Sequence, residues 1–263
     1  MGQISVSIVM PCLNEEKNVR EALLSSLKAM DRLKLDGEVI VVNDGSRDST
    51  QTIVEELMSQ ERRIRLINHD SPQGIGASFW EGAIQARRDF VTMIPGDNEN
   101  DAAEILSYAP LAEQVDIIVP FVQNLEIRSY FRRVVSSIYR LILNVSFGMN
   151  LNYTNGTVMY RASLLRQTQL DSKGFFFQAE LLVRLIRQGY LYAEVPYFLN
   201  VRAQGNTKAI SLRSLGAVMS GYLRLAWNVH MRRSAGRADI LSLSKDSAAF
   251  RRPNLFKSGE DKA

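Results

Sequence analysis

Hydrophobic and polar positions alternate with two different periods along the first half of the chain. Short apolar runs have the length of buried strands and stand at 6–10, 38–42, 64–67, 90–94 and 116–119. Between these runs, apolar residues recur at helical spacing, first in a stripe formed by Val19, Leu23, Leu24, Leu27 and Met30. Strands that alternate with helices are typical of a mostly parallel sheet with helices on both faces. We therefore predict a Rossmann-like α/β fold.

The second half of the chain carries longer helical patterns. Its predicted helices are 128–147, 175–187 and 211–232. Its predicted strands are 154–160 and 192–199. Beyond residue 233 the periodicity gives way to polar and charged residues, which is typical of disorder. We expect three parts: a main domain over 1–210, an amphipathic helix over 211–233 and a disordered tail over 234–263.

The composition is that of a globular protein, with 46% hydrophobic residues in 263. The single cysteine excludes an internal disulfide and, with no signal peptide in the first ten residues, favours the cytoplasm. The uncharged stretch 141–160 is long enough to cross a bilayer, but four asparagines and two glycines interrupt it. We therefore expect no membrane span.

The net charge of +4 is too small to indicate nucleic-acid binding, but the charges are unevenly distributed. Residues 89–126 contain eight acids and no Lys or Arg. Residues 127–170 contain six arginines and no acid, and 195–238 contain seven basic residues and no acid. Such runs are often solvated helix faces. Alternatively, they mark a site that meets a cation on one side and anions on the other.

Polar, turn-forming clusters follow three of the predicted strands, where ligands bind in open α/β sheets. These clusters are 11–15, 43–46 and 95–99. Glu15 and Asp44 have oxygens that accept from a base N–H or a ribose hydroxyl, and Gly45 lets the backbone approach a ligand. Structural explanations also exist, because an Asp-Gly pair favours a turn and Asn14 is predicted to cap a helix.

Asp97 and Glu99 have the residue types and spacing that suit Mg²⁺ or Mn²⁺, with diphosphate oxygens completing the coordination shell. As an alternative, Asp97 would cap a helix. Gly74 and Gly76 do not form a dinucleotide fingerprint, which follows the first strand, and instead predict close helix packing near the nucleotide. Cys12 has no histidine partner in the sequence pattern, which favours a small buried residue over a nucleophile.

Four segments in order, SIVMPCLNEE, VIVVNDGSRDST, NHDSPQGIGASFWEGAIQA and FVTMIPGDNEND, resemble the inverting family 2 glycosyltransferases with a GT-A fold. Later segments, including RSYFRRVVSSIYRLILN, GFFFQAELLVRLIRQGY and EVPYFLNVRAQGNTKAI, resemble the dolichol-phosphate mannose synthase branch, which transfers a sugar from a nucleotide donor to a polyprenyl phosphate. The resemblance covers about residues 6–227. It implies a sugar nucleotide held by Pro11, Glu15 and Asp44, with metal and diphosphate at Asp97. The candidate donor-binding set is completed by Asn14, Gly45, Gly74 and Gly76.

The sequence departs from the family pattern at two positions. Asn43 stands where the family usually has the first of two aspartates. Pro95 replaces the first carboxylate of the D-x-D metal motif, which leaves Asp97 as its second aspartate. Glu99 would restore the lost negative charge. A catalytically weakened nucleotide-sugar-binding protein is therefore one hypothesis.

The acceptor determines which further residues act. A phosphate monoester is already ionised near neutral pH and needs cations rather than a strong base. The candidates for that role are Arg132, Arg133, Arg202 and Lys208. A saccharide hydroxyl would instead need a carboxylate base, for which Glu180 is the candidate. Glu180 is equally explained as a buried acid paired with an arginine.

The helix predicted at 211–232 has the build of an interfacial helix, with basic residues on one face and Tyr222 and Trp227 among its apolar residues. An ordinary packing helix would look similar. The acid-free segments favour the membrane, because anionic headgroups attract basic residues. We expect a peripheral protein at the inner face of the membrane.

Overall fold

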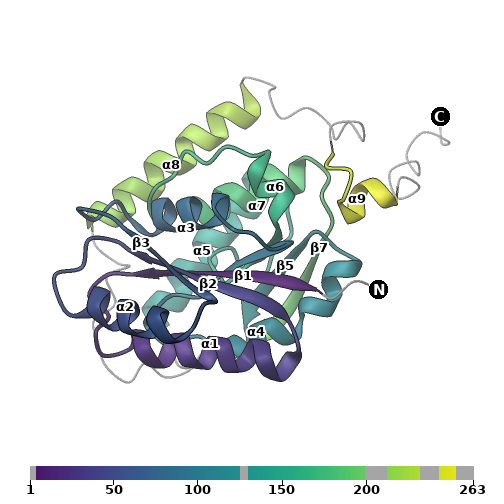
Figure 1. The fold of residues 1–263 in the computed structure, drawn as a ribbon. Coiled ribbons are helices and arrows are strands. Elements are labelled where there is room, and N and C mark those ends of the chain that lie inside the picture. Colours follow the sequence, from purple (N-terminus) through teal and green to yellow (C-terminus); the bar gives the residue numbers. More distant parts are fainter. Residues whose placement is uncertain (1–3, 125–129, 199–211, 232–242, 253–263) are drawn as a thin grey trace, which may run out of the picture.

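The computed structural model describes residues 4–124, 130–198, 212–231 and 243–252, which form an α/β fold around a seven-stranded sheet (Figure 1). The strand order is β3-β2-β1-β4-β6-β5-β7. The strands are β1 (Ser5–Cys12), β2 (Asp36–Asn43), β3 (Ile64–Asn68), β4 (Phe90–Met93), β5 (Ile117–Val122), β6 (Met159–Arg161) and β7 (Tyr192–Tyr197). Strand β6 runs antiparallel to β4 and β5, and the other neighbouring pairs are parallel. The predicted mostly parallel sheet is confirmed.

Helices cover both faces of the sheet (Figure 1). One face carries α1 (Val19–Leu33), α2 (Thr50–Gln60) and α4 (Ala102–Ser107), and the other carries α3 (Ile75–Ile84), α6 (Ala162–Arg166) and α7 (Phe177–Arg187). A 3₁₀ turn at Ala109–Glu113 follows α4. The remaining helices are α5 (Tyr130–Phe147), α8 (Leu212–His230) and α9 (Ala248–Arg251).

Strand β1 shows why both faces of the sheet are covered. All eight of its residues are buried, with Ile8 and Met10 in the core under α1 and Val9 in the core under α3. A strand buried on both sides has a continuous apolar sequence rather than an alternating one. The strand runs two residues past its predicted end, through Pro11, whose carbonyl accepts the N–H of Gly96 at 3.1 Å.

The elements of the second half are shorter than predicted. The strand expected over 154–160 is reduced to β6, because residues 152–158 are bends and irregular backbone, and β7 ends at Tyr197. Helix α1 begins at Val19, so the prediction that Asn14 caps it is wrong. Leu24 belongs to the predicted apolar stripe of α1, but it is 44% exposed, unlike the other four residues of that stripe.

Asn14 joins two loops instead of capping a helix. Its backbone has a positive φ of 57°, its N–H donates to Ser46 Oγ at 2.9 Å, and its side-chain oxygen accepts the N–H of Arg47 at 2.8 Å. Asparagine tolerates this left-handed conformation better than most residues. The polar residues after β1 are therefore used for contacts between loops.

The prediction of a disordered tail from residue 234 is wrong for residues 243–252, which pack on the domain. The side chain of Ser247 caps α9 by accepting the N–H of Phe250 at 3.0 Å, and Ala248 and Ala249 are buried. Their backbone N–H groups donate to the carboxylate of Asp116, at the start of β5. Sequence periodicity missed this segment because contacts with distant residues hold it, among them the buried carboxylate of Asp116 and the hydrogen bond from Ser163 to Asp246. The rest of the predicted tail lies outside the described residues.

Helices α5, α7 and α8 pack together through a core of their own, formed by Leu143, Phe147, Phe176, Ala179, Val183, Leu225 and Val229. The rings of Phe147 and Tyr222 meet edge to face at 6.0 Å, and Ser146 shares a hydrogen bond with the Tyr222 hydroxyl. Within the described part of the chain, no helix combines the length and apolar character needed to cross a membrane.

Candidate active site

Three polar loops meet at the edge of the sheet where β1, β2 and β4 end. The N–H of Asp44 donates to the carbonyl of Cys12 at 2.8 Å, and the N–H of Glu15 donates to Thr50 Oγ1 at 2.8 Å. The loop after β4 joins them through the bond between Gly96 and Pro11 described above. Parallel strands bring their carboxyl ends to the same edge, so the three clusters predicted from sequence are brought together as expected.

Asp44 is buried, and its carboxylate is fastened to the loop that follows β3. It accepts the N–H groups of Gln73 at 2.7 Å and Gly74 at 2.9 Å, and it lies 2.7 Å from His69 Nδ1. Burial alone would raise the pKa of Asp44, but the hydrogen bonds from Gln73, His69 and Gly74 outweigh it and lower the pKa below its ordinary value. Asp44 is therefore ionised at neutral pH and holds two loops of the site together.

The close approach of residues 43–46 to residues 69–74 also requires a glycine at position 45. Its φ is +70°, and a Cβ there would lie 2.8 Å from the backbone of Ser71. Gly74 and Gly76 lie against a different segment: a Cβ on either would come within 2.7 Å of a carbonyl oxygen, of Lys173 and Ser172 respectively. The start of α3 thus packs closely on residues 172–174, in line with the close packing predicted at these two glycines, and their position near the nucleotide stays a prediction.

Asp97 and Glu99 lie in the loop after β4 and are both half-buried. The N–H of Glu99 donates to Asp97 Oδ1 at 3.1 Å. The alternative that Asp97 caps a helix is wrong, because Asp101 caps α4 by accepting the N–H groups of Ala103 and Glu104. Two carboxylates with hard oxygen donors fit Mg²⁺ or Mn²⁺ when a bound diphosphate supplies further oxygens. By themselves they do not enclose an ion: among the described residues, no three His, Cys, Asp or Glu side chains are grouped to hold one.

Cys12 lies beneath this loop and is 2% exposed. Burial, followed by the nearby carboxylates of Glu15 and Asp97, raises the pKa of its thiol far above the ordinary value. A neutral, buried thiol is no nucleophile, which confirms the interpretation of Cys12 as a small packing residue. A Cβ on Gly96 would collide with the Cys12 sulfur, so the metal-candidate loop packs directly on β1.

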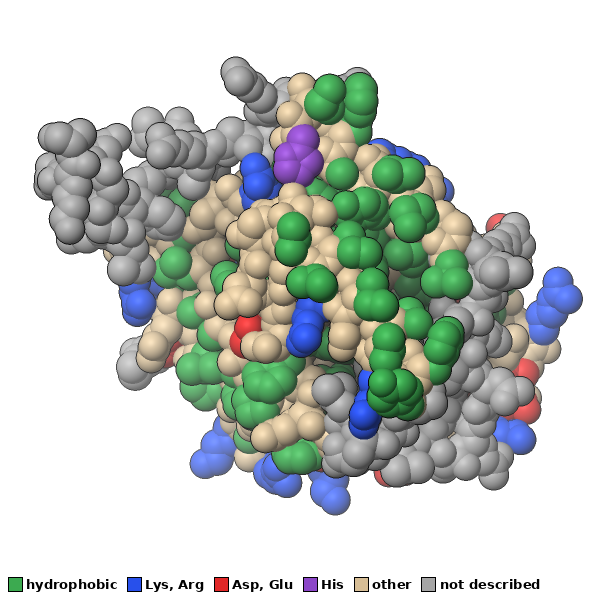
Figure 2. Space-filling view, turned by 180° about the vertical axis from the view of Figure 1, so that it is seen from behind, with side chains coloured by type: hydrophobic (Ala, Val, Ile, Leu, Met, Phe, Trp, Pro, Cys, Tyr) green, Lys and Arg blue, Asp and Glu red, His purple; other side chains and the backbone are tan. Residues whose placement is uncertain are grey.

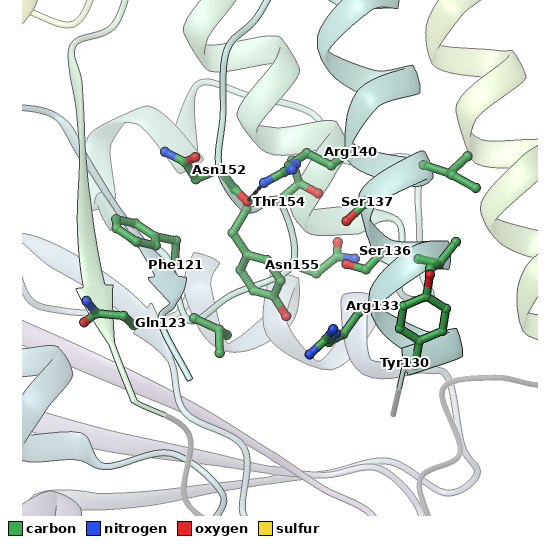
Figure 3. A pocket seen from close by; sticks show the side chains of 14 residues that line it. Phe121, Gln123, Tyr130, Arg133, Ser136, Ser137, Arg140, Asn152, Thr154 and Asn155 are labelled. Atoms are coloured by element: carbon green, nitrogen blue, oxygen red, sulfur yellow. Dashed lines mark hydrogen bonds between the residues drawn. The ribbon is translucent and has the colours of Figure 1, made fainter. Parts of the chain in front are cut away.

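A groove of about 680 Å³ opens between α5, the end of β5 and residues 152–155 (Figure 3). Arg133 and Arg140, two turns apart on α5, reach into it, and Arg140 Nη1 donates to the carbonyl of Asn152 at 3.0 Å. Asn155, from the segment before β6, also lines the groove. Among the described residues that line the groove, none is acidic. An anion in the groove would therefore meet two guanidinium groups. The carboxylate of Glu194 accepts the backbone N–H and the side-chain amide of Asn152.

Comparison with known proteins agrees with this geometry. The family model described as Glycosyl transferase family 2 matches residues 7–173. The chain belongs to this family. It is 30% identical over 118 residues to a dolichyl-phosphate beta-glucosyltransferase of Trichomonas vaginalis, covering 43% of this chain and 35% of that protein. It is 26% identical over 217 residues to the polyprenol monophosphomannose synthase of Mycolicibacterium smegmatis, covering 76% of this chain and 79% of that protein.

The glycosyltransferase spans less than half of the first two relatives it matches, 35% of the Trichomonas protein and 44% of an undecaprenyl-phosphate 4-deoxy-4-formamido-L-arabinose transferase of Pseudomonas fluorescens. Its fold is that of glucosyl-3-phosphoglycerate synthase from Mycobacterium tuberculosis, solved with Mg²⁺ and UDP. That likeness has a TM-score of 0.63 at 20% identity and covers 86% of this chain and 79% of the other. The predicted GT-A type of fold is confirmed.

Glu180 of this glycosyltransferase has the geometry of a structural acid. It is 2% exposed, accepts the N–H groups of Asp171 at 3.1 Å and Ser172 at 3.0 Å, and pairs with Arg184. The alternative predicted from sequence, a buried acid paired with an arginine, is confirmed. Its carboxylate fixes the segment that packs on Gly74 and Gly76. Glu180 therefore stabilises the loop next to these glycines.

The predicted acceptor cations are only partly described. Arg133 lines the groove, and Arg132 belongs to α5, but its side chain is not among those described. Arg202 and Lys208 lie outside the described residues. Sequence analysis did not select Arg140 or Asn155 as site residues. Arg140 could have been selected from the sequence, because it follows Arg133 by two helical turns and therefore lies on the same face of α5.

Proposed function

We propose that this family 2 glycosyltransferase transfers a sugar, with inversion, from a nucleotide diphosphate sugar to a polyprenyl phosphate. The observation that carries the proposal is the groove with Arg133 and Arg140 and without a described acid, at the same edge of the sheet as Asp97. The relatives in Trichomonas and Mycolicibacterium are named for dolichyl phosphate and polyprenol phosphate. The basic groove and the names of these two relatives both support a polyprenyl phosphate as the acceptor.

On the donor side, the loops around Pro11, Glu15 and Asp44 would contact the nucleoside, while Asp97 and Glu99 would hold Mg²⁺ or Mn²⁺ on the diphosphate. A bound divalent cation supplies stabilisation of the negative charge that develops on the leaving diphosphate. The hydrogen bond from the Glu99 N–H to Asp97 Oδ1 would hold the Asp97 carboxylate in position to bind this cation. Pro95 leaves fewer carboxylates than a full D-x-D, so Glu99 is the residue that would replace the missing charge.

On the acceptor side, a phosphate monoester with a second pKa of about 6 is itself an anionic nucleophile near neutral pH. The chain's task is then to bind and orient it, which guanidinium groups do through paired hydrogen bonds. No base needs to be placed, in keeping with the engagement of Glu180 by the N–H groups of Asp171 and Ser172 and by Arg184. The hydroxyl-acceptor alternative has no described carboxylate in the groove to serve it.

A membrane-facing surface would bring the enzyme to such an acceptor. On α8 and just beyond it, exposed apolar residues recur every four positions: Leu215, Met219, Leu223, Trp227 and Met231. Helix α5 exposes Tyr130, Phe131, Ile138, Leu141 and Val145. Figure 2 shows hydrophobic side chains gathered on one face of the molecule with Lys and Arg beside them. Neither helix contains an acid, so the occupant that fits is an anionic bilayer surface at the inner face of the membrane.

Radiolabelled donors test the reaction. The protein is incubated with UDP- or GDP-hexoses, Mn²⁺ and undecaprenyl phosphate in detergent, and the organic-soluble fraction is counted before and after mild acid. We expect an acid-labile product that is lost in Asp97→Asn and retained in Asp36→Asn, an exposed acid paired with Arg88. Sugar transferred only to water-soluble saccharides would contradict the acceptor, and donor binding without turnover would indicate a binding protein.

Vesicle sedimentation tests the surface. Binding is expected to phosphatidylglycerol-containing vesicles, more weakly to phosphatidylcholine alone, and to be reduced by Leu223→Ser with Trp227→Ser. Leu24→Ser is the matched control, because Leu24 is a similarly exposed leucine on α1. Equal binding by the α8 double variant and the control would contradict the assignment of this face.

A further inference from the structure

His69 is held between two carboxylates at the end of β3. Its Nδ1 lies 2.7 Å from Asp44 Oδ1, and its Nε2 lies 2.8 Å from Glu81 Oε2 on α3. The imidazole is 3% exposed, Asp44 is 6% exposed and Glu81 is 43% exposed. The backbone N–H of His69 also donates to the carbonyl of Asn43 at 2.9 Å. The ring thus connects a buried acid of the donor loops to a helix on the face of the sheet.

Only the doubly protonated imidazolium can donate to both carboxylates at once. Burial opposes the charged ring, but the hydrogen bonds and charges of Asp44 and Glu81 outweigh it and raise the pKa of His69. Among the described residues, these two acids are the charged groups bonded to the ring. Arg65, on β3 itself, is engaged with Glu38, and Asp70, next in the chain, is exposed.

The Asp44 carboxylate is the point at which two loops are joined. Besides His69, it binds the N–H groups of Gln73 and Gly74, while Gly45 packs on the backbone of Ser71. These contacts make residues 43–46 and 69–74 one unit. A carboxylate has about four acceptor positions, and this network uses three, which leaves one for a ligand N–H or hydroxyl.

We propose that protonated His69 is a positioning residue for nucleotide binding: it fixes Asp44 and the two loops joined to it, so that affinity for the nucleoside diphosphate falls when His69 loses its proton. The inference deepens the proposed function and rests on it, because it takes the Asp44 loop to be part of the donor site. His69 itself is not a catalytic residue, since it acts through Asp44.

The expected loss of affinity has a physical reason: on deprotonation, the imidazole of His69 loses one N–H donor. A neutral imidazole keeps a single N–H, so its other nitrogen presents a lone pair to a carboxylate. The half-exposed Glu81 can then turn towards water, whereas the buried Asp44 loses its compensating positive charge. The contact between the two loops weakens, and a ligand has to restore it on binding. We expect affinity to fall about tenfold, the effect of roughly one charge-assisted hydrogen bond.

The test uses the fact that the chain has two histidines. His230 lies on α8, bonded to the carbonyl of Ser146, and His230→Asn leaves His69 as the only imidazole signal in a proton NMR titration. In that variant, His69 is expected to titrate above the ordinary value of about 6.5. Binding of UDP and of GDP is then measured by calorimetry with Mn²⁺ across the same pH range, and is expected to weaken along the same curve.

Glu81→Gln separates positioning from simple stability. It removes one of the two anions, so the midpoint of both curves is expected to move down by about one pH unit, while affinity at low pH stays near that of the parent. His69→Asn, which cannot titrate, is expected to bind weakly at every pH. If His69→Asn does not fold, Glu81→Gln alone decides the matter.

The possible outcomes are distinct. Nucleotide binding that stays constant while His69 titrates overturns this inference and leaves the proposed function standing. A His69 signal that titrates at its ordinary value, or curves unmoved by Glu81→Gln, also overturns it. Binding of neither UDP nor GDP at any pH overturns the proposed function, and the role of His69 falls with it.

Discussion

The carboxylate of Asp116 accepts the backbone N–H of Ala248, 132 residues further along the chain, at 2.5 Å. It also accepts the N–H groups of Ala249 and Leu191 and lies 3.4 Å from the guanidinium of Arg161. Asp116 is fully buried. One acid at the amino end of β5 therefore attaches the last described segment of the chain to the sheet.

Replacement of Asp116 by Ala is expected to lower the free energy of unfolding by about 3 kcal/mol or more, because it leaves Arg161 and three N–H groups without their partner. Urea denaturation measures this loss, and proteolysis should open the chain first near residues 243–252. Asp36→Ala removes an exposed acid of similar type and should cost far less. Similar losses in the two variants would contradict the anchoring role.

Gly45→Ala and Gly148→Ala separate backbone strain from steric collision. Both glycines have positive φ, +70° and +65°, so an alanine at either costs about 1 kcal/mol. Only at Gly45 would the new Cβ strike a neighbour, the backbone of Ser71; at Gly148 nothing lies within 4 Å. We expect Gly45→Ala to be clearly less stable and to bind nucleotide more weakly. Equal denaturation midpoints for the two variants would show that the loops that meet at Gly45 can move apart without loss of stability.

Glu38 gives the fold a dependence on acid pH. Burial raises its pKa, but bonds from the Arg87 N–H, Ser7 and Arg65 more than compensate and lower it. An acid with a lowered pKa stabilises the folded state above its unfolded value of about 4.3, and that contribution is lost as pH falls through the folded pKa. Thermal unfolding between about pH 3 and 6 should therefore show a smaller decline in Glu38→Gln than in the parent. Glu56→Gln, at an exposed ion pair with Arg20, should follow the parent curve.

Glu180→Gln distinguishes a structural acid from a catalytic base. The amide keeps the shape of the side chain but weakens the bonds to Arg184 and to the N–H groups of Asp171 and Ser172. We expect a loss of stability of about 2 kcal/mol and a moderate fall in activity, with the shape of the pH–rate profile unchanged. A loss of activity by several orders of magnitude at unchanged stability would identify Glu180 as a base instead.

Arg140→Ala should weaken the polyprenyl phosphate site while sparing the donor site. Arg140 lines the groove from α5 and bonds the carbonyl of Asn152, whereas Asp44 and Asp97 belong to the loops after β2 and β4. The expected result is a rise of about tenfold or more in KM for the lipid phosphate, with the donor KM little changed. Arg20→Ala, on α1, is the control. A parallel rise in both KM values would place Arg140 at the donor instead.

The first half of the fold was predictable because its strands are buried on both faces and their apolar runs stand out, as in β1 and β2. The loops at the carboxyl edge followed from the same pattern. The sequence could not show that Asp44 faces inward to His69, or that Asp116 fastens residues 243–252, because both depend on contacts between distant segments. Glu180 was ambiguous for the same reason: its partners at 171 and 172 lie in a loop whose path only the folded chain defines.

Strand β6 is antiparallel to its neighbours β4 and β5. The edge of the sheet at which β1, β2 and β4 end is therefore also the edge at which β6 begins. The candidate donor loops follow the ends of β1, β2 and β4, whereas residues 152–155, in the wall of the groove, precede β6. The two candidate sites therefore draw on separate stretches of chain attached to one sheet. Under the proposed function, exchange of residues 152–155 between relatives is expected to alter the acceptor while leaving the candidate donor loops intact, which offers a modular route to new lipid-linked products.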